Sequence, residues 1–345
     1  MAVRKAVWGV VLLLLFGCGG ISAKGQEAFR IVTFNVENLC DTIHDVGYND
    51  FEYLPTAARE WTSGRYNRKL QAIAEAISNA GGTTWPWLVA LCEVENACVL
   101  DVLLATTPLG AAGYRYTISC SDDPRGMDVA LLYLEDRFRI VGSEEWTIPF
   151  ISDTTKRSRN ILHVEGRFFN DAPLDLLIVH LPSRRGGAWR SRKVRNEAMT
   201  FLATQCDSLL AVDPNRSILI LGDFNATPYD RSSIHLFPPL CKDAPLSDQA
   251  NLYDITTLLS KDSYPGSYYY GGITEQLDRF IVSRSLLDRT LGGVKVVVGS
   301  VTNVPHLSMR RLADGRSIPL RTYGGTHYLG GVSDHLAVSA LFFLK

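Results

Sequence analysis

Acidic, amide and imidazole side chains stand beside the most apolar runs of this 345-residue sequence. The polar residues that closely follow or precede such a run are Asn35, Glu93, His180, Asp223, Asn225, Asp278, Asp334 and His335. A polar group next to a buried strand must be hydrogen-bonded, metal-bound or solvated, and one such group alone is most simply a solvated loop residue. The same character at so many strand ends indicates a shared site, since ligand sites in sheet-based folds gather where loops converge.

Three of these residues suit a divalent cation. Glu93 and Asp334 offer hard oxygen donors of the kind that Mg²⁺ or Mn²⁺ prefers, and Asn35 adds a neutral oxygen. The sequence has no HExxH motif and no Cys/His cluster, which argues against a dedicated zinc site. Its seven cysteines are irregularly spaced without a CxxC pair, so no disulfide pairing can be read from them. We expect Asn35, Glu93 and Asp334 to hold Mg²⁺ or Mn²⁺.

The other polar residues suit attack of water on a phosphate. Asp223 can orient and deprotonate a water molecule, while Asn225 holds the phosphate in line. His180 and His335 can donate hydrogen bonds to a phosphoryl oxygen that gains charge in the transition state. The chemistry that this set predicts is metal-assisted hydrolysis of a phosphate ester.

The elements that must position these residues follow from apolar periodicity. Short, nearly continuous apolar runs indicate strands buried on both faces. They cover residues 30–36, 87–92, 127–134, 174–180, 217–222, 277–282 and 336–343. Helical spacing of apolar residues occurs between them, around 70–77 and 194–209. The adjacent runs 127–134 and 137–145 are expected to form a hairpin, so the pattern predicts mixed sheets with helices outside rather than a doubly wound parallel sheet.

Composition places the chain among ordinary globular proteins. Hydrophobic residues make up 46% and charged residues 21% of the chain, close to globular averages. The formal net charge of -1 argues against coating of nucleic acid by bulk positive charge, but it allows a local grip on a few phosphates. No repeat, low-complexity tract or long linker divides the sequence. We expect residues 24–345 to form one domain that acts as a monomer.

The first 23 residues have the order of an export signal. Basic residues at positions 4 and 5 precede an apolar run over 6–16, and small residues follow. That run is shorter than the about 20 residues a transmembrane helix needs. Leu15-Phe16-Gly17-Cys18 resembles a bacterial lipobox, whereas Ile21-Ser22-Ala23 offers an unlipidated cleavage site. We expect export to the bacterial periplasm, cell surface or medium; membrane attachment through a lipidated Cys18 stays open.

Five segments in this order resemble motifs of the endonuclease/exonuclease/phosphatase superfamily, which includes pancreatic deoxyribonuclease, exonuclease III-like repair enzymes, bacterial sphingomyelinases and inositol polyphosphate 5-phosphatases. They are Thr33-Phe34-Asn35-Val36, Cys92-Glu93-Val94, Gly222-Asp223-Phe224-Asn225, Leu277-Asp278-Arg279-Phe280 and Ser333-Asp334-His335. The resemblance spans essentially the whole mature chain. It implies a four-layer α/β sandwich, with two mixed sheets face to face and helices outside.

The resemblance also implies a role for each matched residue. Glu93 would be the principal metal ligand, with Asn35 and Asp334 beside the metal. Asp223 would activate water and Asn225 would orient the phosphate. Asp278 would orient the final histidine, His335, and His335 would contact the scissile phosphate.

Three positions connect less directly with the family motifs. His180 resembles a histidine that the nuclease and sphingomyelinase branch carries after this strand, and there a second carboxylate holds it. Asp128 is our candidate for that carboxylate, although it could equally cap a loop at the start of a strand. Cys92 stands where the family usually has Gln, which affects the surroundings of Glu93 rather than its role.

The substrate is the least determined feature. Arg184 and Arg185 follow His180 closely, and a guanidinium is a good bidentate phosphate ligand. The tyrosines at 268–270 could stack on a base or sugar, or could simply pack a loop. We expect an exported, endonuclease-like phosphodiester hydrolase acting on nucleic acid. The alternatives are a phosphatase or phosphodiesterase of phospholipid head groups or inositol phosphates, and an inactive binding module.

Overall fold

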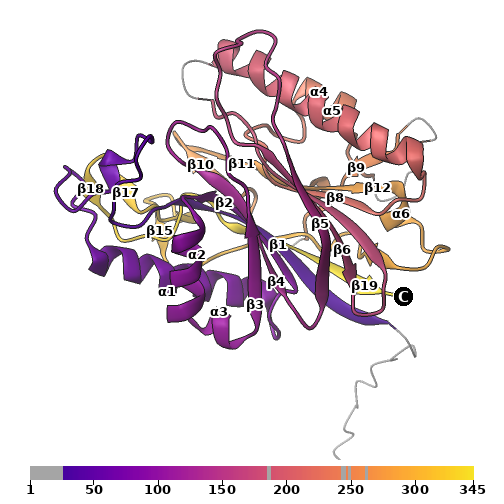
Figure 1. Cartoon of the computed structure of the whole chain (residues 1–345), viewed down its shortest axis with the longest axis horizontal. Coiled ribbons are helices and arrows are strands. Elements are labelled where there is room, and N and C mark those ends of the chain that lie inside the picture. Colours follow the sequence, from indigo (N-terminus) through magenta and orange to yellow (C-terminus); the bar gives the residue numbers. More distant parts are fainter. Residues whose placement is uncertain (1–25, 185–187, 242–245, 248–249, 261–262) are drawn as a thin grey trace, which may run out of the picture.

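Two β-sheets packed face to face form the centre of the molecule, and helices cover their outer faces (Figure 1). The computed structural model describes residues 26–184, 188–241, 246–247, 250–260 and 263–345. The predicted export signal and Cys18 lie outside these residues. The predicted four-layer α/β sandwich with two mixed sheets is confirmed.

The first sheet holds the two ends of the chain side by side. Its central strand β1 pairs antiparallel with β19 and parallel with β2. The order is β13-β19-β1-β2-β4-β3, and β14 also pairs with β19. The strands are β1 (Glu27–Leu39), β2 (Leu88–Val94), β3 (Tyr114–Ile118), β4 (Asp128–Leu134), β13 (Val294–Val296), β14 (Thr302–Val304) and β19 (Ala337–Leu344).

The second sheet is built from the middle of the chain. Its order is β5-β6-β7-β8-β12-β9, and β7 and β8 are its parallel pair. The strands are β5 (Phe138–Trp146), β6 (Ile161–Phe168), β7 (Pro173–His180), β8 (Ile218–Asp223), β9 (Leu252–Asp254) and β12 (Asp278–Ser283).

Strands β7 and β8 are apolar on both faces because each face is covered. Successive side chains of a strand point to opposite faces. Leu176 and Leu219 belong to the main core between the sheets, whereas Leu177 and Ile220 pack in the second core beneath helix α4 (Ala188–Val212). This double burial explains why the runs 174–180 and 217–222 lack the polar alternation of a one-sided strand.

The helices form the two outer layers. Helix α1 (Ser63–Gly81) packs on β1 and β19, and α2 (Ala97–Thr106) and α3 (Pro108–Ala111) lie beside it on the first sheet. Helix α4 and the short α5 (Arg231–Leu236) lie on the opposite side of the molecule (Figure 1). Among the described residues, no helix combines the length and apolarity that crossing a bilayer requires.

Short elements complete the chain near the strand ends. In the described part of the chain, three hairpins lie outside the two sheets: β10 (Tyr268–Tyr270) with β11 (Ile273–Glu275), β15 (Met309–Arg311) with β16 (Ser317–Pro319), and β17 (Tyr323–Gly324) with β18 (His327–Tyr328). Helix α6 (Arg284–Leu287) follows β12, and single 3₁₀ turns cover Phe51–Tyr53 and Thr256–Leu258. The six described cysteines are free thiols.

The predicted hairpin between 127–134 and 137–145 is wrong. Strand β4 pairs with β2 and β3 in the first sheet, whereas β5 pairs with β6 in the second. The short connection between them therefore crosses from one sheet to the other. Two strands that are joined by a short turn can pair with each other or belong to different sheets, and here β5 pairs along its length with β6 instead.

Candidate active site

Three predicted residues lie in one row at an end of the second sheet. His180 pairs in register with Asp223 across β7 and β8, and Asp223 pairs with Asp278 across β8 and β12. Gly222 makes this close approach possible: its φ is 140°, and a β-carbon there would lie 1.9 Å from the carbonyl oxygen of Val179. The Gly-Asp sequence at the end of β8 therefore reflects a backbone requirement as well as chemistry.

The first sheet brings Asn35 and Glu93 to the same place. Asn35 pairs with Cys92 across β1 and β2, and the register shifts just beyond them. The Asn35 side chain reaches across to the second sheet, where Nδ2 donates to Oδ2 of Asp223 at 3.1 Å. The ends of both sheets thus meet at one site.

Backbone strain is concentrated at this meeting point. Four residues there have the left-handed backbone conformation that residues other than glycine rarely adopt: Glu37 (φ 51°), Asn38 (φ 53°), Glu93 (φ 64°) and Asn225 (φ 50°). Such conformations cost about 1–3 kcal/mol each and collect at functional sites. The strained backbone is independent support for a functional site here.

His335 is held as an imidazolium. Its Nδ1 lies 2.7 Å from Oδ2 of Asp278, and Ser267 Oγ donates to the same carboxylate oxygen at 2.6 Å. Burial disfavours the charged ring, but Asp278 and then Asp223 and Asp334 outweigh it and raise the pKa of His335 to about 10. The predicted pairing of Asp278 with His335 is present in the structure.

Asp223 is a buried carboxylate fixed by three hydrogen bonds. Its Oδ1 accepts from the Asn225 backbone N–H at 2.8 Å, and its Oδ2 accepts from the side chains of Asn35 and Asn225, each at 3.1 Å. Burial raises the pKa of Asp223 to about 6, although His335 pulls it down. A base whose pKa is near neutrality suits removal of a proton from water.

His180 lies beside Asp223 as a neutral ring. Its Nε2 is 3.5 Å from Asp223 Oδ2 and 3.9 Å from Glu93 Oε1. Burial, helped by Arg159 and Arg125, lowers its pKa well below the usual value.

The expected support of His180 by Asp128 needs correction. Within the described chain the Nδ1 of His180 is buried without a hydrogen-bond partner. The Asp128 carboxylate instead accepts from Ser119 Oγ at 2.7 Å and from the Ser121 backbone N–H at 3.0 Å. Asp128 begins β4 in the first sheet and is occupied in fixing the loop beside that strand, the loop role that the sequence had left open.

Carboxylates gather next to Asp223 in a way that fits a divalent cation. The Oε2 of Glu93 accepts from the Asn38 backbone N–H at 2.9 Å, while its Oε1 lies 3.9 Å from Arg125 Nη1 and 3.9 Å from His180 Nε2. Asp334 is half-buried and ion-paired with Arg321. Carboxylate oxygens are hard donors of the kind that Mg²⁺ or Mn²⁺ takes.

Glu37 is a site residue that the sequence analysis missed. Its carboxylate accepts from the Thr322 backbone N–H at 2.7 Å and lies 3.4 Å from Arg321 Nε. Burial, then the nearby Asp334 carboxylate, raise its pKa to about 7. Arg321 and the buried Lys69 supply part of the positive charge that these neighbouring carboxylates require. Its position two residues after Asn35, on the same strand, was the available signal.

Lys69 was also missed because it lies in a helix far from every motif. Its Nζ is buried and donates to the Glu37 backbone oxygen at 2.5 Å and to Thr322 Oγ1 at 2.8 Å. The attraction of Glu37, Glu93 and Asp334 for this ammonium opposes the burial that lowers its pKa. Lys69 therefore ties helix α1 to the strand ends that carry the carboxylates.

The two arginines predicted to bind phosphate have different outcomes. Arg184 Nη1 contacts the Glu275 carboxylate at 2.7 and 2.8 Å, and its Nε donates to the Asn225 backbone oxygen at 3.1 Å. Its guanidinium is thus already paired and positions the Asn225 loop, which corrects the predicted role. Arg185 lies outside the described residues.

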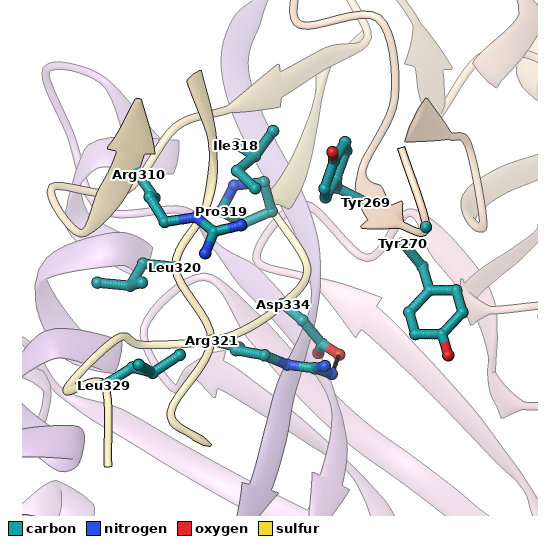
Figure 2. A pocket seen from close by; sticks show the side chains of 10 residues that line it. Tyr269, Tyr270, Arg310, Ile318, Pro319, Leu320, Arg321, Leu329 and Asp334 are labelled. Atoms are coloured by element: carbon teal, nitrogen blue, oxygen red, sulfur yellow. Dashed lines mark hydrogen bonds and ion pairs between the residues drawn. The ribbon is translucent and has the colours of Figure 1, made fainter. Parts of the chain in front are cut away.

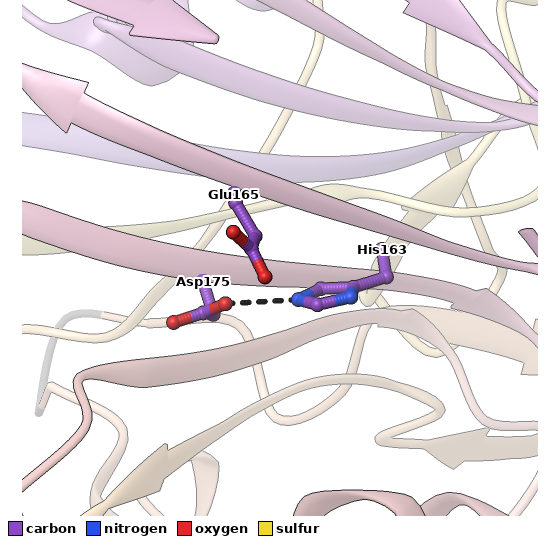
Figure 3. Close-up of side chains that lie close together, drawn as sticks. All are labelled: His163, Glu165 and Asp175. Carbon is purple, nitrogen blue, oxygen red and sulfur yellow. Dashed lines mark hydrogen bonds and ion pairs between the residues drawn. The ribbon is translucent and has the colours of Figure 1, made fainter. Parts of the chain in front are cut away.

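A second acidic cluster lies away from this site, at the far end of β7 (Figure 3). His163, Glu165 and Asp175 bring ligand atoms within 4.8 Å of one another. Arg216 donates to both Glu165 and Asp175 at 2.7 Å, and His163 Nε2 lies 2.9 Å from Asp175. The cluster already contains its compensating positive charge, so we interpret it as a structural ion-pair network.

Comparisons with known proteins agree with this architecture. A zebrafish TDP2 with 14 humanizing mutations is 17% identical, with a TM-score of 0.57 over 91% of this chain and 98% of that one. The human Nocturnin catalytic domain is 19% identical, with a TM-score of 0.56 over 92% and 95%. An endonuclease/exonuclease/phosphatase family protein from Bacteroides thetaiotaomicron is 14% identical, with a TM-score of 0.56 over 93% and 96%. At such identities these likenesses show the fold alone.

The family follows from the sequence itself. No curated protein matches the chain. The model of the endonuclease/exonuclease/phosphatase family matches residues 30–344, which include every strand end described above. The chain therefore belongs to the endonuclease/exonuclease/phosphatase family, whose members are phosphoesterases.

Proposed function

We propose that this chain hydrolyses phosphodiester bonds with the help of Mg²⁺ or Mn²⁺, by attack of water on phosphorus. The observation that carries the proposal is the surroundings of the Asp223 carboxylate. Its Oδ2 lies 3.1 Å from Asn35 Nδ2, 3.5 Å from His180 Nε2 and 3.9 Å from His335 Nε2. A carboxylate whose pKa is near neutrality (Asp223), a neutral imidazole (His180) and an imidazolium (His335) therefore face one small region between the two sheets.

Asp223 supplies the base in this mechanism. With a pKa of about 6 it is ionised at neutral pH and still accepts a proton from water. The hydrogen bonds from Asn35 and Asn225 hold its oxygens in place, so little reorganisation is needed as the proton moves. The water oxygen forms the new bond to phosphorus as its proton passes to Asp223, while the bond from phosphorus to one ester oxygen breaks and that oxygen leaves as an alcohol after taking a proton from solvent.

The two histidines stabilise the phosphoryl oxygens. His335 is charged well above neutral pH and places an N–H donor within 3.9 Å of Asp223. His180 is neutral, and the nearby carboxylates Asp223 and Glu93 favour the tautomer with its proton on Nε2. Both rings can therefore donate to the negative charge that grows on phosphate oxygens.

Glu93 and Asp334 would hold the cation, with Asn35 adding its amide oxygen beside them. When bound there, a divalent cation neutralises charge on the phosphoryl group as a Lewis acid. Asn35 Oδ1 accepts from the Glu37 backbone N–H at 3.0 Å, which orients that oxygen. An amide oxygen has a second lone pair for a further partner.

The charge balance favours a diester over a monoester as substrate. Arg125 is engaged with Asp123 and Glu93, Arg184 with Glu275, and Arg321 with Asp334. A phosphomonoester is a dianion near neutral pH and calls for unpaired cations around it. A phosphodiester carries one negative charge and needs fewer cations around it. We therefore propose an endonuclease-like phosphodiesterase acting on nucleic acid.

We also propose that the enzyme works after export, as a monomer. This part of the proposal rests on residues 1–23, which lie outside the described structure. Lipid attachment at Cys18 and free release both remain compatible with that segment.

Plasmid nicking set against phosphate release tests the function. The purified protein is incubated with supercoiled plasmid and, separately, with inositol polyphosphates, in Mg²⁺ or in excess chelator. We expect Mg²⁺-dependent nicking that is lost in Asp223→Asn and kept in Asp171→Asn, whose carboxylate is exposed far from the site. Release of phosphate without nicking would support the phosphatase alternative instead. No turnover of either substrate would support a binding module.

A further inference from the structure

A pocket outside the catalytic cluster opens between two hairpins (Figure 2). Tyr269 and Tyr270 from the β10–β11 hairpin form one side of it, and Arg310 from the β15–β16 hairpin lies on the other. The remaining lining residues are Gly271, Ile318, Pro319, Leu320, Arg321, Leu329 and Asp334. Its volume of about 190 Å³ is below the roughly 300–1,000 Å³ of clefts that hold a whole small ligand. The space suits one ring rather than a complete molecule.

The pocket is joined to the catalytic residues through its walls. Asp334, a proposed metal ligand, lines it directly. Tyr268, which precedes the two pocket tyrosines, packs on the His335 ring with centroids 4.6 Å apart and forms a β-bridge with that residue. A group that occupies the pocket would therefore be attached close to a phosphate held between Asp334 and His335.

The chemistry of the walls favours a flat ring that carries a phosphate. Two phenol rings and the apolar side chains of Ile318, Leu320 and Leu329 offer surfaces for stacking and packing. Arg310 is exposed, and within the described residues its guanidinium has no hydrogen bond or ion pair, unlike Arg321, which is paired with Asp334. One unpaired cation beside aromatic faces matches the combination that binds single-stranded nucleic acid.

We propose that this pocket binds the nucleobase of the nucleotide whose phosphate is cleaved, with the base against Tyr269 and Tyr270 and Arg310 contacting the base or the adjoining phosphate. This inference rests on the proposed phosphodiesterase activity and names its substrate class. A polyol such as inositol is a poorer fit, because its hydroxyl groups would meet mostly apolar walls.

Three nitrophenyl diesters test the proposal through the specificity ratio. They are the thymidine 5′, methyl and myo-inositol 1 esters of 4-nitrophenyl phosphate, which share one leaving group. We expect kcat/KM for the thymidine ester to exceed that for the methyl ester, mainly through KM. We expect Arg310→Ala and Tyr269→Leu each to lower this ratio about tenfold, the scale of a lost stacking or phosphate contact.

Matched controls come from the same elements. Arg311→Ala removes the neighbouring arginine of β15, whose side chain belongs to the other face of the strand and does not line the pocket. A second control from outside these elements, Phe169→Leu, removes an exposed aromatic ring from the turn between β6 and β7, at the end of the second sheet opposite the catalytic row. Both should keep the wild-type ratio. An unchanged ratio in Arg310→Ala and Tyr269→Leu would overturn the proposal, as would a preference for the inositol ester that these two variants abolish.

A binding measurement separates failure of this inference from failure of the proposed function. Calorimetry with thymidine 5′-methyl phosphate, a diester, in excess chelator requires no turnover, so it decides the pocket even if no ester is cleaved. We expect binding that Arg310→Ala and Tyr269→Leu weaken about tenfold and that Arg311→Ala does not change. Equal binding by all three variants would refute the base pocket. Binding of the wild type to phosphatidylcholine vesicles, lost in Tyr270→Leu, would indicate that the hairpin meets a membrane instead.

Discussion

The Nδ1 atom of His335 lies 2.7 Å from the Oδ2 atom of Asp278, although 57 positions separate the two residues. Asp278 begins β12 in the second sheet, whereas His335 comes just before β19 in the first. The contact therefore joins the two sheets and sets the charge of the ring at the same time. Asp278 is fully buried and also accepts from Ser267, so it has little freedom to release the histidine.

Asp278→Asn should shift the alkaline limit of activity to lower pH. The negative charge of Asp278 helps to raise the pKa of His335 to about 10. Without it the ring loses its proton at lower pH, so the decline in kcat begins earlier as pH rises. We expect kcat at neutral pH to fall by about 10²-fold or more. Rates measured from pH 6 to 10 check this, and an unmoved alkaline limb would contradict it.

Asp223→Asn should remove the base and leave the fold intact. Burial already penalises the charged form of this carboxyl, so a neutral amide of the same shape keeps the fold, although its NH2 group cannot accept the two hydrogen bonds that Oδ2 receives. We expect kcat/KM to fall by about 10³-fold, with a circular dichroism spectrum close to that of the wild type and a cooperative thermal transition. The wild-type rate should itself decline below pH 6, because Asp223 then becomes protonated. Near-normal turnover in the folded variant would refute the assignment.

Glu93→Gln should weaken the dependence on metal rather than the fold. The substitution removes a hard anionic donor, so we expect the Mg²⁺ concentration for half-maximal activity to rise more than about tenfold, a loss seen even for groups that only support a metal ligand. Glu165→Gln is the matched control, since that carboxylate belongs to the network neutralised by Arg216. Equal Mg²⁺ dependence in both variants would speak against Glu93 as a ligand.

His163→Gln should destabilise the protein more in mild acid than in alkali. Although burial opposes it, hydrogen bonds to Asp175 and Glu144 raise the pKa of His163 above its ordinary value. A raised folded-state pKa gives stability that is complete below about pH 6.5 and declines as pH rises through the folded-state pKa. We expect a loss of about 1–3 kcal/mol at pH 6 and a smaller loss at pH 9, measured by urea unfolding. A gap that grows with pH would contradict the sign.

The strands and the catalytic row could be predicted because their signals are local. Continuous apolar runs marked β7 and β8 as strands covered on both faces, and the structure buries them between one core and another. A polar residue at the end of each run therefore had to lie at the edge of the sheet. His180, Asp223 and Asp278 were assigned from their own strands, and the register of the sheet brings them together.

Partners chosen across the fold could not be predicted in the same way. The sequence made Arg184 a candidate phosphate ligand, but in the folded chain Glu275 lies beside it and pairs with its guanidinium. From the sequence, Asp128 could hydrogen-bond His180 or residues of its own loop. In the structure it accepts a hydrogen bond from Ser119 of that loop. Lys69 is buried among backbone oxygens from distant segments of the chain, and no local sequence pattern predicts these contacts. Each of these outcomes depends on contacts between residues far apart in the sequence.

The position of Mn²⁺ in a crystal of the protein, located by its anomalous scattering, decides whether the ends of the two sheets form a metal site. We predict one strong peak at the ends of the two sheets, bound by Glu93 with Asp334 and Asn35 beside it. A manganese ion held only by His163, Glu165 and Asp175, or no ordered ion at saturating concentration, would contradict it.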